Sequence, residues 1–381
     1  MDFTFKNSIS RIVLNNYLSR AVTHASLLDT QEGQTDTFED DLRMLMNEGA
    51  KFIGRAAYVW SVVDDDEHWR KCRERAELCH KADSELMLQC CVFECVYRDF
   101  CENTPIPEWV FEAFEQPYEN RCFSMEKMSF PDGRFTNHWG KNTVVPNIMS
   151  LEGQMWLYYR ACMYINCGCE AIHFGQVWLI GALDKDWLTW HKIVKMVREY
   201  AKVHARRGYV VCDAHCHGII TPDGYSVFDF NSFPIRLREI VDEPMKCLVE
   251  LGYSDSLFGR SKGGVHPSGW TADPLPFLVE FDNFGVSKTP GQATPDSIFA
   301  WGYDEITWFA IQPAEYRAEF LRYINDWVNS RYPEGWVQMP SRRIVSGIRD
   351  KMTVYRANTK SSDCPLGLSD ETAIAEIWQK N

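Results

Sequence analysis

The sequence predicts an α/β fold, a (β/α)8 barrel of the TIM type with an N-terminal extension and a C-terminal tail. Short apolar segments of strand length alternate along the chain with longer amphipathic segments, which is the order of βαβ units. Seven or eight such strands can be counted in 381 residues, the number that closes a barrel. No Gly-x-Gly-x-x-Gly motif follows any of them, which disfavours an open dinucleotide-binding sheet.

The predicted strands are apolar segments that Gly, Pro or polar residues bound. Residues 275–285, Leu-Pro-Phe-Leu-Val-Glu-Phe-Asp-Asn-Phe-Gly, illustrate the pattern, since Pro276 and Gly285 lie at or near the two ends. A third strand is expected near residue 121, in a stretch whose pattern is less regular. In chain order, the predicted strands lie at 51–60, 86–97, near 121, 170–180, 209–213, 225–232, 275–285 and 306–310.

The predicted helices show apolar residues three and four positions apart. The segment 186–207 has the most regular pattern, and it ends in a cationic turn followed by Gly208, a typical C-cap. The acidic residues at 64–67 predict the start of another helix, because acids stabilise the positive end of the helix dipole. The other predicted helices cover 107–115, 152–167 and 313–328.

The domain organisation follows from where these elements lie. Residues 1–48 are polar and mixed, and we expect them to form an extension that packs on the outside of the barrel. Residues 49–381 would form the barrel and include the C-terminal tail. A chain of this length is sufficient for one large domain, so we expect a single domain overall.

Composition and charge disfavour two classes of partner, nucleic acids and membranes. The net charge of −13 disfavours a nucleic-acid partner, because proteins that neutralise phosphates present basic surfaces. No apolar run has the roughly 20 residues that a membrane helix needs, and no signal pattern begins the chain, so we expect a cytoplasmic protein without a membrane partner. The 14 cysteines are then expected to be reduced thiols, most of them in the core.

Polar side chains recur where the predicted strands end. In a (β/α)8 barrel, the C-terminal ends of the strands converge on one site. Polar groups repeated at these positions are difficult to explain as core, although each could be a structural hydrogen-bond partner. We therefore expect one pocket that contains Glu94, His173, Gln176, Asp213, His215, His217, Asp229, Asn231, Glu280, Asp282, Asp304 and Glu305.

Two carboxylates in the 275–285 strand are the first catalytic candidates. Glu280 and Asp282 are two residues apart, so both point to one face of an extended chain. Hydrolysis of a glycosidic bond needs one carboxyl group to protonate the leaving oxygen and another to act as nucleophile or base. We assign Glu280 as nucleophile or base and Asp282 or Asp213 as the acid, kept protonated by its neighbour's charge. The alternative is a salt-bridged structural pair.

Side chains near these carboxylates could orient the hydroxyl groups of a substrate. We expect this role for His173, Gln176, His215 and Asn283. The glycine-rich loop 258–270 contains Arg260 and Lys262, which could hold an anionic group of the substrate. An ordinary solvent-exposed loop is the alternative explanation.

The segment Asp213-Ala-His215-Cys-His217 supports a second hypothesis. Two histidines two residues apart at a strand end can bind a divalent metal, with a carboxylate such as Asp282 or Asp304 completing the site. The protein would then be a metal-dependent hydrolase or isomerase. Otherwise we expect no cofactor. A third hypothesis is a barrel that binds sugar without catalysis.

Four segments resemble a family of uncharacterised bacterial proteins classed as glycoside hydrolases: Cys-Asp-Ala-His-Cys-His-Gly at 212–218, Phe-Gly-Arg-Ser-Lys-Gly-Gly at 258–264, Leu-Val-Glu-Phe-Asp-Asn-Phe-Gly at 278–285 and Trp-Gly-Tyr-Asp-Glu-Ile at 301–306. The resemblance implies a (β/α)8 barrel and a carbohydrate or small sugar-derived substrate. Glu280 matches the strand-seven nucleophile of many retaining glycosidase barrels. The fourth strand ends in His173-Phe-Gly-Gln176 and has no carboxylate there, so the acid is expected on another strand. The oligomeric state is left open.

Overall fold

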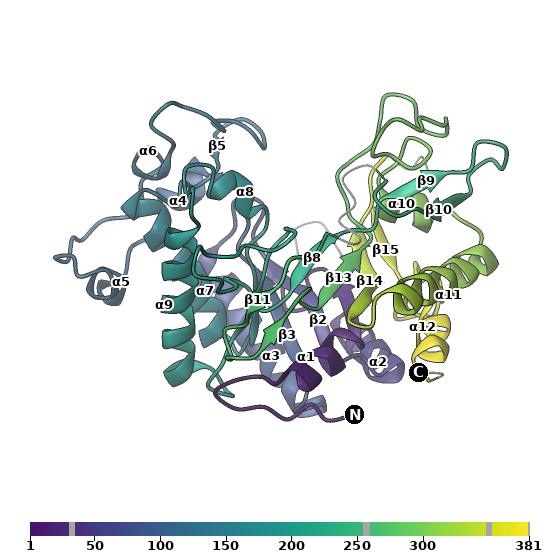
Figure 1. The fold of residues 1–381 in the computed structure, drawn as a ribbon, viewed down its shortest axis with the longest axis horizontal. Helices are drawn as coiled ribbons and strands as arrows, with labels where there is room; N and C mark the ends of the chain where they lie inside the picture. The colour runs from purple at the N-terminus through teal and green to yellow at the C-terminus, as the bar shows by residue number, and fades with distance from the viewer. Residues whose placement is uncertain (30–34, 254–259, 348–352, 380–381) are drawn as a thin grey trace.

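The computed structural model describes residues 1–29, 35–253, 260–347 and 353–379, and a barrel of eight parallel strands forms its centre (Figure 1). The sheet order is β7-β6-β3-β2-β1-β14-β13-β8. A parallel bridge between His215 and Ser232 joins the chain after β7 to β8 and closes the ring. The predicted (β/α)8 barrel is confirmed. Its strands are β1 (Ala21–His24), β2 (Phe52–Tyr58), β3 (Met87–Cys91), β6 (Ala171–His173), β7 (Val211–Asp213), β8 (Asn231–Pro234), β13 (Phe277–Glu280) and β14 (Gly335–Ile344).

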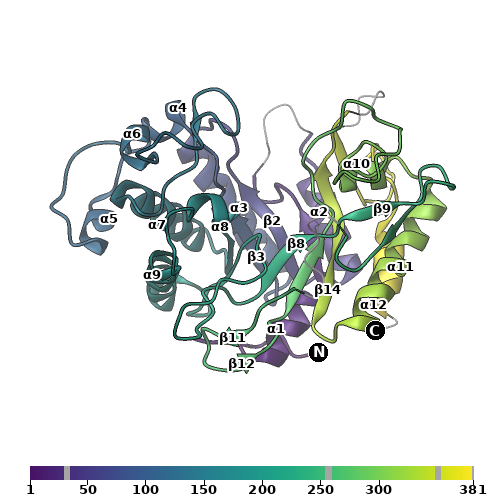
Figure 2. The ribbon, with the colours of Figure 1, turned by 45° about the horizontal axis from the view of Figure 1, so that its top comes forward.

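Helices surround the barrel on two sides (Figures 1 and 2). On one side, α3 (Asp65–Ala82) and α9 (Leu188–His204) both pack against α7 (Leu151–Asn166). On the other, α12 (Glu371–Gln379) packs against both α2 (Phe38–Glu48) and α11 (Ala314–Arg331). None of the helices in the described ranges is long and apolar enough to span a bilayer. The remaining helices are α1 (Arg11–Leu18), α4 (Arg98–Cys101), α5 (Glu108–Ala113), α6 (Met125–Met128), α8 (Val177–Ile180) and α10 (Glu305–Ala310).

Short strands outside the barrel form small two-stranded sheets in the loops, and one further strand extends the main sheet. β15 (Val354–Arg356) pairs antiparallel with β14. The two-stranded sheets are β4 (Val96–Tyr97) with β5 (Thr143–Val144), β9 (Leu237–Glu239) with β10 (Cys247–Val249), and β11 (Gly264–Val265) with β12 (Thr271–Ala272).

The prediction that residues 1–48 lie outside the barrel is wrong for β1. This strand pairs in parallel with β2 on one side and β14 on the other, so it is a full member of the ring. All four of its residues are buried, and it is too short to show a strand pattern. The residues that precede β1 cover the N-terminal end of the barrel strands. There, Phe3, Phe5 and Tyr17 pack in one cluster with Phe52 and Phe230.

The prediction of a last strand at 306–310 is also wrong, because these residues belong to α10. Asp304 caps this helix by accepting a hydrogen bond from the Thr307 amide. All six residues of α10 are buried, so the helix has no polar face and its sequence resembles a buried strand. The third strand predicted near residue 121 is absent as well; Cys122 makes only an isolated bridge with Pro105.

The eighth barrel strand is β14, which the sequence pattern did not reveal. Pro340 lies inside it, and proline normally excludes a segment from the interior of a sheet. Pro340 pairs with Thr23 at the point where the register of β1 and β14 shifts, so its missing N–H falls at an irregular position. The buried polar residues that follow it, Ser341, Arg342 and Arg343, further obscure the pattern.

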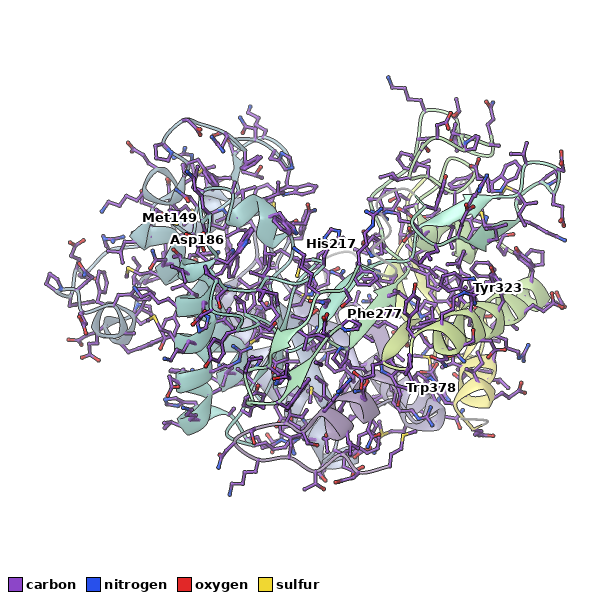
Figure 3. All side chains as sticks on the ribbon, in the orientation of Figure 1. Met149, Asp186, His217, Phe277, Tyr323 and Trp378 are labelled. Atoms are coloured by element: carbon purple, nitrogen blue, oxygen red, sulfur yellow. The ribbon has the colours of Figure 1, made fainter. Side chains whose placement is uncertain are left out.

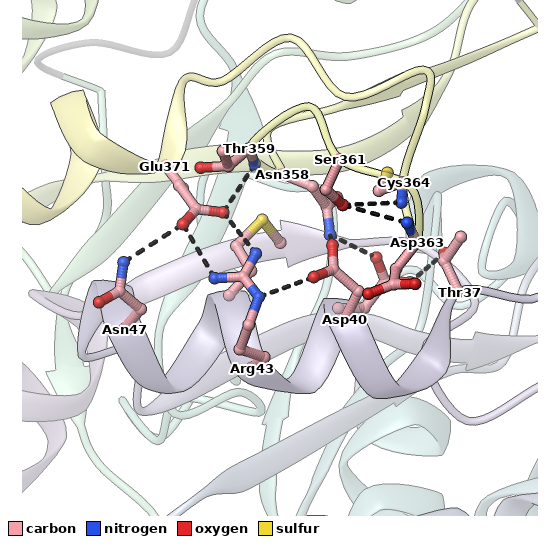
Figure 4. Close-up of polar contacts among 12 residues, drawn as sticks. Thr37, Asp40, Arg43, Asn47, Asn358, Thr359, Ser361, Asp363, Cys364 and Glu371 are labelled. Atoms are coloured by element: carbon pink, nitrogen blue, oxygen red, sulfur yellow. Dashed lines mark hydrogen bonds and ion pairs between the residues drawn. The ribbon is translucent and has the colours of Figure 1, made fainter.

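The C-terminal segment is tied to α2 by a polar network (Figure 4). Arg43 makes ion pairs with Asp40 at 2.7 Å and with Glu371 at 2.9 Å. Asn358 donates hydrogen bonds to Asp40 at 2.8 Å and to Asp41 at 3.0 Å. The network therefore joins α2 to the C-terminal segment on one side of the barrel.

Candidate active site

A cavity of about 940 Å³ opens at the C-terminal end of the barrel. Its lining comes from the C-terminal parts of seven of the eight barrel strands and the segments that follow them, which is where (β/α)8 barrels hold their sites. Six of the predicted site residues border it: Glu94, His173, Gln176, His215, Asp282 and Asn283. Glu280 and Asp213 lie directly behind these residues and bind them or their partners.

Glu280 is held by two arginines. Arg55 binds both of its carboxylate oxygens, with Nε 3.1 Å from Oε2. Nη2 of Arg343 lies 3.7 Å from Oε2 of Glu280 and 3.2 Å from Oδ1 of Asp282. Burial alone would raise the pKa of Glu280, but the charges of Arg55 and Arg343 hold it well below its usual range. Glu280 and Asp282 therefore meet one guanidinium.

Arg55 reaches Glu280 because β2 is bulged at this point. The register between β2 and β3 shifts between Ile53 and Ala57, and Arg55 itself has a φ of 59°, in the left-handed region. Backbone conformations of this kind cost about 1–3 kcal/mol and persist where the surroundings enforce them. The preceding residue is Gly54, and a Cβ there would collide with Nε2 of Gln338 unless that side chain moved. The local backbone is thus shaped to direct this one side chain.

Asp213 and His173 form a buried pair at the ends of β7 and β6. Nδ1 of His173 lies 2.8 Å from Oδ2 of Asp213. Asp213 also accepts hydrogen bonds from Ser232 Oγ at 2.6 Å and from Gln89 Nε2 at 2.6 Å. Since a carboxylate can only accept, Nδ1 of His173 carries the proton. Nε2 has no hydrogen-bond partner in the described parts of the chain.

Glu94 follows β3 and borders the cavity from a buried position, with 2% of its surface exposed. Its Oε2 accepts a hydrogen bond from the Gln176 amide at 3.0 Å. Burial raises the pKa of Glu94, and neither this hydrogen bond nor the charges of His173 and Arg55 cancels the shift. The chain passes close above it at Gly175, where φ is 56° and a Cβ would collide with Oε2 of Glu94.

Asp282 and His215 occupy the other side of the cavity. Oδ1 of Asp282 accepts the Asn283 amide at 2.8 Å and lies beside Arg343, while no hydrogen bond to Oδ2 comes from any described residue. Burial lowers the pKa of His215, and the nearby charges of Asp282 and Glu280 only partly oppose this. His215 is therefore neutral near pH 7 and can both donate and accept hydrogen bonds.

Aromatic rings form one wall of the cavity. Trp60 makes edge-to-face contacts with Phe93 and Trp139, with centroid distances of 5.3 Å and 5.4 Å. Tyr58 meets Phe93 in the same geometry at 5.4 Å. The wall offers aromatic rings against which a sugar ring can pack, and the same cavity holds polar groups that can bind its hydroxyls.

Several predicted site residues lie elsewhere, which corrects the prediction of one shared pocket. Asp229 is fully buried away from the cavity lining, where it binds Arg198 at 2.7 Å and the Cys212 amide at 2.8 Å. Asn231 donates to Ser261 Oγ at 2.7 Å and to two backbone carbonyls, so it fixes the neighbouring loop. Asp304 caps α10, and Glu305 binds Arg236 at 3.0 Å.

The cations of the glycine-rich loop are also outside the cavity lining. Arg260 and Lys262 are exposed, and residues 258 and 259 of this motif lie outside the described residues. His217 lies at the upper end of the barrel in Figure 3, and its carbonyl accepts the Lys262 amide at 2.7 Å. Among the described residues, no group of three or more His, Cys, Asp or Glu side chains is placed to hold a metal ion. The metal hypothesis therefore has no ligand cluster in this part of the chain to support it.

Sequence reasoning missed the two arginines and Gln89. Arg55 lies inside an apolar strand, where a lone cation between Gly54 and Ala56 is itself a signal, because a buried charge requires a partner. Arg343 could not be found in this way, since β14 was not recognised. Gln89 lies in the middle of β3, where an amide between apolar residues resembles an ordinary core position.

No protein-family model and no curated protein matches this chain. Among solved structures, the debranching enzyme of Nostoc punctiforme soaked with acarbose aligns with 99% of this chain and 83% of its own, at 10% identity and a TM-score of 0.48. Its native form aligns with 56% of this chain and 50% of its own, at 11% identity and a TM-score of 0.33. The type III pullulan hydrolase from Thermococcus kodakarensis aligns with 96% and 70%, at 12% identity and a TM-score of 0.43. Similarities this low carry no argument about activity, which must come from the site.

Proposed function

We propose that this protein is a glycoside hydrolase that cleaves a glycosidic bond at the mouth of its barrel. One observation carries the proposal: two carboxyl groups of the same cavity have opposite environments. Burial raises the pKa of Glu94, whereas Asp282 lies 3.2 Å from the guanidinium of Arg343. Carboxyl pairs of this kind divide into a proton donor and a charged partner, as glycosidic bond cleavage requires.

Glu94 is the general acid in this proposal. Its burial keeps the carboxyl group protonated to higher pH than an exposed glutamate, so it can give a proton to the leaving oxygen. Asp282 is the charged partner, whose Oδ2 is available to stabilise positive charge at the anomeric carbon. Glu280, first assigned as nucleophile or base, has both oxygens bound by Arg55, so we assign it to hold Arg55 and Arg343 in place.

The substrate class follows from the walls of the cavity. Trp60, Phe93 and Trp139 offer apolar ring faces and edges. Gln176, His215 and Asn283 border the same space and offer donors and acceptors for hydroxyl groups. This combination fits a carbohydrate, and the volume accommodates more than one sugar ring.

Leaving-group dependence tests the role of Glu94. The wild-type protein is first screened against a panel of aryl glycosides and oligosaccharides. On a substrate that it cleaves, Glu94→Gln should lose about 100- to 10,000-fold in rate when the leaving group is poor. The same variant should retain most of its rate on a dinitrophenyl glycoside, which leaves without a proton. Asp282→Asn should lose activity on both.

The matched control is Glu108→Gln, an exposed glutamate at the start of α5 far from the cavity, which should leave both rates unchanged. Equal losses of Glu94→Gln on good and poor leaving groups would remove Glu94 as the acid. A folded wild-type protein that cleaves nothing in the panel would contradict the proposed function.

A further inference from the structure

The Asp213–His173 pair has an arrangement that the proposed roles of Glu94 and Asp282 do not use. His173 borders the cavity, so one side of its ring faces the substrate space. The other side is fixed, because Nδ1 lies 2.8 Å from Oδ2 of Asp213. The ring nitrogen left for a ligand is Nε2, and in the neutral imidazole the proton on Nδ1 leaves Nε2 as an acceptor.

Asp213 is itself held so that it cannot turn away. Ser232 Oγ donates to the same oxygen that His173 uses, at 2.6 Å, and Gln89 Nε2 donates to the other oxygen at 2.6 Å. These donors come from β8, which is bridged to the chain after β7, and from β3, which lies beyond β6 on the other side, so groups from both sides of β7 fix the carboxylate. A carboxylate with three donors and 1% exposure orients a neighbour and does not reach the substrate.

We propose that His173 is the base that activates the attacking water, and that Asp213 is its positioning residue. This inference rests on the proposed glycoside hydrolase function, and it adds a base to the acid that was assigned there. Because the water that His173 activates attacks the anomeric carbon directly, hydrolysis takes place in one displacement, and the anomeric configuration inverts.

The step balances as follows. The oxygen of a water molecule forms a bond to the anomeric carbon while one of its protons passes to Nε2 of His173. The bond from the anomeric carbon to the leaving oxygen breaks, its electron pair stays on that oxygen, and the oxygen takes the proton of Glu94. His173 then releases its proton to solvent and Glu94 takes one up, which restores the site. The products are two sugars or a sugar and an alcohol.

The first test measures the tautomer in the wild-type protein, so it needs no variant that could misfold. Nitrogen NMR of protein labelled in its histidines should show that the neutral ring of His173 carries its proton on Nδ1 and none on Nε2. In Asp213→Asn, the amide of the new side chain can donate to Nδ1, and the proton should move to Nε2. A wild-type His173 with its proton on Nε2 would overturn the proposal.

The second test uses a substrate that the protein cleaves. His173→Gly should lower kcat by about 100- to 10,000-fold with little change in KM, and added imidazole should restore part of the rate. His191→Gly, a histidine on α9 outside the cavity lining, is the matched control and should keep the wild-type rate. A loss in His173→Gly without rescue in a folded variant would indicate a structural role and overturn the base.

Proton NMR of the first product gives its anomeric configuration, which distinguishes this inference from the proposed function on which it rests. Release of the inverted anomer supports His173 as the base. Hydrolysis with retention would overturn this role and leave the glycoside hydrolase proposal standing, with Asp282 as the nucleophile. No hydrolysis would overturn both.

Discussion

Arg55 and Glu280 bind each other across the mouth of the barrel through both oxygens of the carboxylate. Arg55 comes from β2 and Glu280 from β13, and β1 and β14 lie between these strands in the ring. The pair therefore links β2 to β13 at the end of the barrel where the cavity opens, and it holds Arg55 in the cavity lining. It also explains why the most conspicuous acidic residue of the sequence is, in our account, a supporting group.

Removing one partner of this pair should destabilise the fold. Arg55→Met leaves a buried carboxylate with only the more distant Arg343, and we expect a loss of roughly 3–5 kcal/mol in the free energy of unfolding. Glu280→Met should act in the same direction. The double variant Arg55→Met/Glu280→Met should lose less than the sum of the two single effects. Urea denaturation of the four proteins measures this, and additive losses would show that the pair is not coupled.

The approach of Gly175 to Glu94 predicts a specific defect. In Gly175→Ala, the new Cβ would collide with Oε2 of Glu94, so the carboxyl group must move and we expect a loss of roughly 100-fold in activity. Gly133→Ala is the matched control, because Gly133 has a φ of 73° but open space around its Cβ position. Both variants should lose roughly 1–2 kcal/mol of stability from the left-handed backbone. Equal activity in both would contradict the placement of Glu94.

The aromatic wall should contribute directly to ligand binding. Trp60→Ala removes the ring that contacts Phe93 and Trp139, and we expect the dissociation constant for a bound oligosaccharide to rise roughly 5- to 10-fold, about 1–1.5 kcal/mol. Trp178→Ala is the control, since Trp178 is 43% exposed and lies outside the cavity lining. Calorimetry on both variants decides the point, and an unchanged affinity in Trp60→Ala would exclude the wall from the binding site.

Glu48 should make the stability of the protein depend on pH. It is buried at the end of α2, and neither of its oxygens has a hydrogen-bond partner in the described structure. Burial, then the charge of Glu371, raises its pKa well above the ordinary 4.5, although Arg43 opposes this. As pH rises above 4.5, the unfolded chain releases this proton while the folded chain keeps it. The free energy of unfolding therefore falls with increasing pH.

Glu48→Gln should therefore be more stable than wild type at pH 8 by roughly 1–3 kcal/mol, and the advantage should shrink toward pH 4. Thermal unfolding across this pH range measures the difference. Glu39→Gln, at an exposed position of the same helix, should show no such trend. An advantage independent of pH would contradict the titration of Glu48.

The sequence predicted the barrel and part of the site for identifiable reasons. Strands such as β13 are apolar and bounded by Pro276 and Gly285, and long helices such as α9 have one apolar face. Where the pattern was lost, a physical cause is evident: β1 is only four residues long, β14 contains Pro340, and α10 is buried on all sides.

Within the site, position along a strand predicted some of the residues that border the cavity but not what each does. Glu94, His173 and Asp282 were found because they follow barrel strands. Their roles depend on partners from distant strands, such as Arg343 for Asp282 and Asp213 for His173. Spacing within one segment cannot reveal such contacts.

The most direct test of the central claim is hydrolysis in water enriched in oxygen-18. If the protein cleaves the bond between the anomeric carbon and the leaving oxygen, the sugar released with a new reducing end should carry one heavy oxygen at its anomeric position. The leaving group should carry none, and the label should disappear with the activity in Glu94→Gln on an unactivated oligosaccharide. Heavy oxygen in the leaving group, or labelled product formed equally fast by Glu94→Gln, would contradict the account.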